Sequence, residues 1–131
     1  PETIDKANIL AGFPKLVDFF ARVPAVSVVS SQVEDDAYWW IKFDIDLEHH
    51  LAWRVVQEFG FILNYISVSE PLPTVFKPVS PPPYLNGGTE FLSWVVESTF
   101  NYIDPEWILS FLEGRLPQPV SDETAWMIEE D

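Results

Sequence analysis

The sequence has no cysteine, which excludes disulfides, thiol nucleophiles and cysteine-ligated metal sites. Basic residues are scarce as well. Seven Lys and Arg stand against 21 Asp and Glu, and the formal net charge is −14. Such a charge repels phosphate backbones and anionic lipid surfaces, so we expect neither nucleic acid nor a membrane as a partner. The same charge would attract a basic protein, and it also helps to keep an apolar chain in solution.

Long apolar runs are also missing, and the chain does not open on a basic segment followed by an apolar one. We therefore expect no membrane span and no signal peptide, and a cytoplasmic location. No Gly-x-Ser-x-Gly motif occurs, and the glycines at 87–88 are too few for a phosphate-binding loop. The sequence thus carries no recognisable catalytic motif, and we expect no cofactor.

Apolar residues are plentiful at 47%, with six Trp and ten Phe, and 131 residues suffice for one domain with a hydrophobic core. Periodicity and turn residues predict the order of the elements. The first three elements in chain order are a helix over 4–23 interrupted at Gly12 and Pro14 and strands over 25–33 and 37–46. A helix follows from 47, and it either ends at Gly60 with a strand over 61–69 after it or runs to about 66. The last three are an edge strand over 75–79, a strand over 90–99 and a helix from Pro105 to Gly114.

The segment 37–46 shows the clearest strand pattern, because large apolar residues occupy every second position. We predict an α+β fold with a mostly antiparallel sheet of four to five strands packed by three helices. Residues 1–117 should form this single domain, and 118–131 an acidic C-terminal tail. The predicted core residues are Trp39, Ile41, Phe43, Ile45, Leu51, Val55, Trp94, Val96, Ile108 and Phe111.

The best chemical candidates are Asp44, Asp46, His49 and His50, since carboxylates and imidazoles suit a divalent metal or acid–base catalysis. We expect the histidines in the first turn of the helix that Asp46 caps. Adjacent helical residues point about 100° apart, so both imidazoles would not readily share one ion. This group is therefore kept as the enzyme or metal-site alternative, and we expect no bound metal.

Four aromatic residues are candidates for partner binding. Tyr38 and Trp40 share one strand face, which water, another element or a second protein must cover. Tyr84 ends a Pro-Pro-Pro-Tyr segment that matches the Pro-Pro-x-Tyr pattern bound by WW domains, although a rigid connector would have the same composition. Trp126 lies in the expected tail, and aromatic side chains of this kind commonly anchor interfaces.

The order helix, strand hairpin, helix, strands, helix in a small acidic chain resembles class I type III secretion chaperones and their fold relatives. The resemblance covers about residues 4–114 and is one of architecture, size and charge. Such chaperones are small acidic homodimers that hold extended segments of client proteins. The resemblance therefore implies a homodimer and a client polypeptide, and it identifies no site residues.

These observations predict a non-catalytic, protein-binding role, as a chaperone-like protein or an adaptor, and the net charge favours a basic protein as the partner. One alternative is an immunity-type inhibitor that neutralises a basic toxin through charge complementarity. The other alternative is a small enzyme or metal-binding protein that uses the two aspartates and two histidines of the 44–50 segment.

Overall fold

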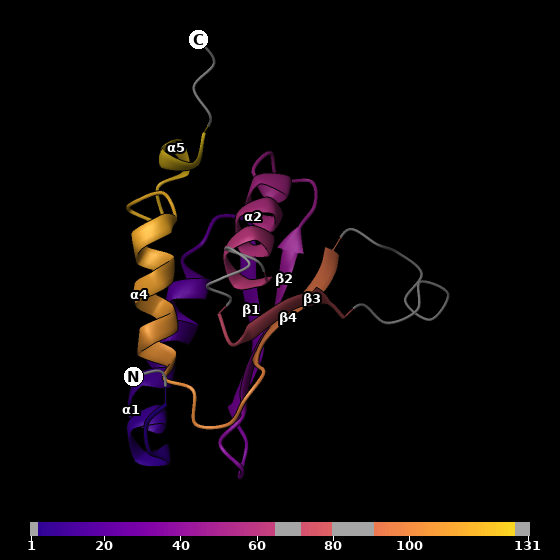
Figure 1. Ribbon diagram of the computed structural model, residues 1–131. Helices are drawn as coiled ribbons and strands as arrows, with labels where there is room; N and C mark the ends of the chain where they lie inside the picture. Colours follow the sequence, from indigo (N-terminus) through magenta and orange to yellow (C-terminus); the bar gives the residue numbers. More distant parts are fainter. Residues whose placement is uncertain (1–2, 65–71, 80–90, 128–131) are drawn as a thin grey trace, which may run out of the picture.

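The computed structural model describes residues 3–64, 72–79 and 91–127 (Figure 1). For residues 91 and 92 it describes the backbone alone. One antiparallel sheet runs in the order β1-β2-β4-β3. The strands are β1 (Val26–Val33), β2 (Trp39–Asp46), β3 (Thr74–Pro78) and β4 (Phe91–Ser98). The helices are α1 (Lys6–Ala21), α2 (Ala52–Phe59), the π-helical segment η1 (Gly60–Asn64), α4 (Pro105–Arg115) and α5 (Glu123–Trp126). The predicted α+β class is confirmed, and β3 is the edge strand expected near 75–79.

The core confirms the strand register that the sequence predicts. Along β2 the side chains alternate between buried and half-buried, and four of its five large apolar residues are fully buried, all except Trp40. The other predicted core residues are buried too, except Phe111, which is half-buried against the core. Aromatic rings fill the space between the sheet and the helices. Phe43 stacks between Phe20 and Phe76, with ring centroids at 5.4 and 6.0 Å, and Phe76 stacks on Trp94 at 4.6 Å.

Helix α1 is continuous, so the expected interruption at Gly12 and Pro14 is wrong. Proline within a helix costs about 3 kcal/mol, whereas each large apolar side chain that α1 buries contributes about 1.5–3 kcal/mol. Five such residues are buried, which outweighs the lost backbone hydrogen bond. They are Ile9, Phe13, Leu16, Phe19 and Phe20.

Gly12 of α1 lies against the Glu106 side chain of α4. A Cβ atom at Gly12 would lie 2.8 Å from Cγ of Glu106, so a larger residue would collide with this side chain unless it moves. Beside it, Lys15 Nζ donates to Glu106 Oε1 at 2.8 Å. This hydrogen bond and the carboxylate charge raise the pKa of Lys15.

The helix after β2 begins later than the sequence predicts. Asp46 Oδ1 accepts a hydrogen bond from the Glu48 amide at 3.0 Å, so it caps a turn over 47–51, and α2 starts at Ala52 without a side-chain cap. Helical structure does not end at Gly60, since α2 is followed directly by η1, which runs to Asn64. Helix α4 begins at Pro105 as expected but passes Gly114 and ends at Arg115.

The π-helical segment η1 places Asn64 against the outer edge of the sheet. The Asn64 side-chain amide donates to the Phe76 carbonyl at 2.9 Å and accepts from the Phe76 amide at 2.6 Å. Thr74 Oγ1 in turn donates to the Leu63 carbonyl at 2.9 Å. Edge strands present unpaired backbone groups, and here a side chain satisfies those of Phe76. Among the described residues, no helix is long and apolar enough to cross a membrane.

Candidate functional site

The four chemical candidates of the 44–50 segment do not converge. Asp44 Oδ1 accepts from Ser93 Oγ at 2.6 Å across the β2–β4 pair, and Asp46 caps the turn that follows β2. In the described ranges, the histidines instead share their one cluster of metal-ligating groups with Glu123 of α5. The predicted grouping of Asp44 and Asp46 with His49 and His50 is therefore corrected to His49, His50 and Glu123.

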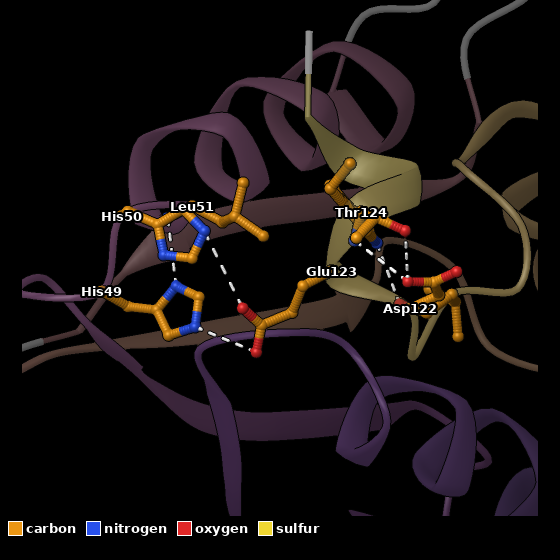
Figure 2. Close-up of polar contacts among 8 residues, drawn as sticks. His49, His50, Leu51, Asp122, Glu123 and Thr124 are labelled. Atoms are coloured by element: carbon orange, nitrogen blue, oxygen red, sulfur yellow. Dashed lines mark hydrogen bonds and ion pairs between the residues drawn. The ribbon is translucent and has the colours of Figure 1, made fainter.

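The two histidines lie side by side because they belong to a turn and not to a helix. Their rings stack with centroids 4.7 Å apart and an interplanar angle of 15°. Figure 2 shows both rings reaching one carboxylate, with His49 Nε2 3.5 Å from Glu123 Oε2 and His50 Nε2 3.8 Å from Glu123 Oε1. The expectation that the two imidazoles would diverge by a helical step is thus wrong.

Glu123 was missed because its segment reads as a polar tail. Asp122 caps the short helix α5 by accepting from the Thr124 amide at 3.0 Å and from Thr124 Oγ1 at 2.7 Å. Trp126 is fully buried and its Nε1 donates to the Val120 carbonyl at 2.9 Å. A capping aspartate followed by an apolar residue was the available signal. Residues up to Met127 thus belong to the packed structure, and the Trp126 side chain is not at the surface.

The hydrogen bonding of His49 bears on what this cluster can bind. His49 Nδ1 accepts the Leu51 amide at 3.0 Å, so in the neutral imidazole the proton resides on Nε2, facing Glu123. A metal bound at Nε2 would displace that proton and break the bond from Leu51. Losing one such hydrogen bond costs about 1–3 kcal/mol, and the bonds to a metal ion must offset this cost.

A second candidate lies at the far end of the β1–β2 hairpin. The turn carries Glu34, Asp35 and Asp36, and with Tyr38 these residues line an open hollow of about 450 Å³. The Glu34 carboxylate already has a partner, because its Oε1 accepts a hydrogen bond from Trp40 Nε1 at 2.8 Å. The Trp40 side chain is half-buried. Asp35 and Asp36 are exposed, and in the described part of the chain their carboxylates form no ion pair.

The loop between β4 and α4 lies beside this hairpin, as Figure 1 shows. The Tyr102 amide donates to the Ala37 carbonyl at 3.1 Å, which brings the loop to the hairpin. Phe100 and Tyr102 leave 63% and 42% of their area exposed, and Tyr38 leaves 38%. We call Glu34, Asp35, Asp36, Tyr38, Phe100 and Tyr102 together the hairpin-end surface. It joins exposed aromatic rings and carboxylates from two distant parts of the sequence.

Tyr38 is thus the one sequence candidate that the structure places on this surface as an exposed side chain. Tyr84 and its Pro-Pro-Pro-Tyr segment lie outside the described residues. Phe100 and Tyr102 had no sequence signal, because isolated aromatic residues in a loop are as often buried as exposed.

Comparisons of this chain with protein-family models, with curated proteins and with solved structures found no match.

Proposed function

We propose that the protein binds a basic polypeptide without catalysis, and that the hairpin-end surface is the binding site. The observation that carries this proposal is the combination of three exposed aromatic rings with two exposed carboxylates, those of Asp35 and Asp36, which form no ion pair within the described residues. Lys6 already lies at this surface, where its Nζ donates to the Asp35 backbone carbonyl at 3.0 Å. A lysine or arginine side chain can pair with a carboxylate while its stem or guanidinium group lies on an aromatic face. The net charge of −14 would steer such a partner toward the protein.

The chaperone-like and immunity-type alternatives both use this surface and differ in the partner. A chaperone or adaptor holds an extended segment, whereas an immunity protein binds one folded basic toxin with an on-rate that falls steeply with salt. The enzyme alternative has less support, because Asp44 and Asp46 are occupied by structural hydrogen bonds.

Peptide binding tests the site. A fluorescein-labelled nona-arginine peptide should bind with micromolar affinity that weakens between about 50 and about 200 mM salt, since screening reduces charge attraction. The double variant Asp35→Asn/Asp36→Asn should weaken binding at least about tenfold, which corresponds to about 1.4 kcal/mol. The matched control is Glu48→Gln/Glu113→Gln, because both glutamates are exposed and the net charge changes equally.

A variant that leaves the net charge unchanged distinguishes binding at a specific site from attraction to the overall negative charge. Tyr38→Ala/Phe100→Ala should weaken the peptide several-fold, because each exposed cation–π contact contributes about 0.5–1 kcal/mol. If both aspartate and control variants weaken binding equally and the aromatic variant has no effect, the peptide responds to net charge alone and the proposed site is wrong.

Self-association is the second part of the proposed function. Trp53 of α2 and Phe61 of η1 are large apolar side chains that leave 62% and 55% of their area exposed. We infer that a second copy of the chain covers these two side chains, which would give a homodimer of the kind that the chaperone-like reading implies.

A further inference from the structure

We propose that His49, His50 and Glu123 form a zinc site that fastens the C-terminal segment to the turn before α2. All their ligand atoms lie within 4.8 Å of one another. Zinc bonds of about 2.1 Å at tetrahedral angles would place neighbouring ligand atoms about 3.4 Å apart. The two histidine-to-carboxylate distances, 3.5 and 3.8 Å, approach that spacing. Because the two imidazole rings stack at 15°, at least one ring must rotate to direct its nitrogen lone pair at a shared ion.

The donor set selects the kind of ion. Two imidazole nitrogens and one carboxylate suit zinc and its first-row neighbours, whereas magnesium and calcium prefer oxygen ligands alone. The His50 and Glu123 side chains are 60% and 52% exposed, so an ion can enter from solvent without opening the fold. Three protein ligands leave the fourth tetrahedral position to water.

The elements around the site indicate what a bound ion would do. The histidines belong to the turn after β2, and Glu123 belongs to α5, near the end of the chain (Figure 2). Below the cluster, Trp126 and Met127 line a hollow of about 230 Å³ with His50, Leu51 and Arg54. A zinc ion would therefore act as a clip that couples metal binding to the docking of α5 and its buried Trp126.

Isothermal titration of the full, tag-free chain with zinc chloride, after treatment with EDTA and dialysis, tests the site. We expect one zinc ion per chain. Glu123→Gln and His50→Gln should each weaken zinc binding at least tenfold, and Glu113→Gln should leave it unchanged, because Glu113 is an exposed carboxylate outside the cluster. Magnesium should not compete.

Two further readouts link the ion to α5. Zinc at about 100 times its Kd should lower the unfolded-to-folded ratio in urea about 100-fold, and Glu123→Gln should remove this gain. Hydrogen exchange of the α5 amides should slow with zinc in the unaltered chain. Unfolding curves without metal verify that each variant folds. The proposal is overturned by the absence of stoichiometric zinc, by equal zinc affinity in Glu123→Gln and Glu113→Gln, or by binding that leaves α5 exchange unchanged.

Discussion

Trp126 is the residue whose structural role differs most from the one its sequence position suggests. Its indole is fully buried and its N–H is satisfied by the Val120 carbonyl, while its neighbour Met127 leaves 56% of its area exposed. The two residues are adjacent in a segment whose sequence is typical of a polar tail. Because only Trp126 is buried, it should contribute far more than Met127 to the free energy of unfolding.

Trp126→Ala should destabilise the protein by about 3–5 kcal/mol, since it removes a buried aromatic side chain and leaves a cavity. The measurement is the free energy of unfolding in urea. Met127→Ala is the matched control and should change this free energy by less than about 0.5 kcal/mol. Equal effects of the two substitutions would mean that α5 does not pack as described.

Gly12 offers a second test at a single residue, because two effects oppose each other there. Gly12→Ala gains about 1 kcal/mol of helix propensity, but its methyl group would collide with Cγ of Glu106 at 2.8 Å. We expect a net loss of stability of about 1 kcal/mol in the unaltered background.

In a Glu106→Ala background the collision disappears, so Gly12→Ala should become stabilising by up to about 1 kcal/mol. A double-mutant cycle from chemical unfolding measures this change of sign. An identical effect of Gly12→Ala in both backgrounds would show that the Glu106 side chain does not restrict residue 12.

At the scale of elements, the π-helical segment η1 and the edge strand β3 stabilise each other. The two hydrogen bonds from Asn64 satisfy the amide and carbonyl of Phe76. A regular helix that ended at Gly60 would not place an amide side chain there. This contact explains why a segment with an ambiguous sequence pattern continues past its glycine.

Asn64→Ala should destabilise the protein by about 1–3 kcal/mol, because it leaves two backbone groups of β3 without partners. Native-state hydrogen exchange at the Phe76 amide should accelerate. Gln57→Ala, on the exposed face of α2, should have little effect on either measurement. Unchanged exchange at Phe76 in Asn64→Ala would contradict the role of this side chain.

At the scale of the whole molecule, net charge and apolar surface act against each other in self-association. Two copies with a charge of −14 each repel, whereas the exposed Trp53 and Phe61 favour contact. Because salt screens the repulsion and leaves apolar contact intact, the dimer fraction should rise from about 0.05 M to about 0.5 M NaCl.

Light scattering over a concentration series measures this equilibrium. Trp53→Ser should shift it to monomer at both salt concentrations, and Leu10→Ser, which alters another exposed apolar residue, on α1, should not. A monomer at every protein and salt concentration would refute the homodimer.

The sequence alone determined most of the sheet and the core. Alternation along 37–46 indicates which face of that strand is buried, and a one-residue slip would expose Trp39, Ile41, Phe43 and Ile45. The capping pair Asp104 and Pro105 likewise predicts the start of α4, because both act within one helical turn. Local chemistry suffices wherever the deciding contacts are close in sequence.

Only the tertiary structure decided the candidate sites, because each joins segments far apart along the chain. Glu123 of α5 meets His49 and His50 of the turn after β2, and Tyr102 meets the hairpin with a hydrogen bond to Ala37. Pro14 remains helical because the buried face of α1 outweighs the lost backbone bond. Sequence periodicity reports which face of an element is apolar, and it carries no information on which distant element will cover that face.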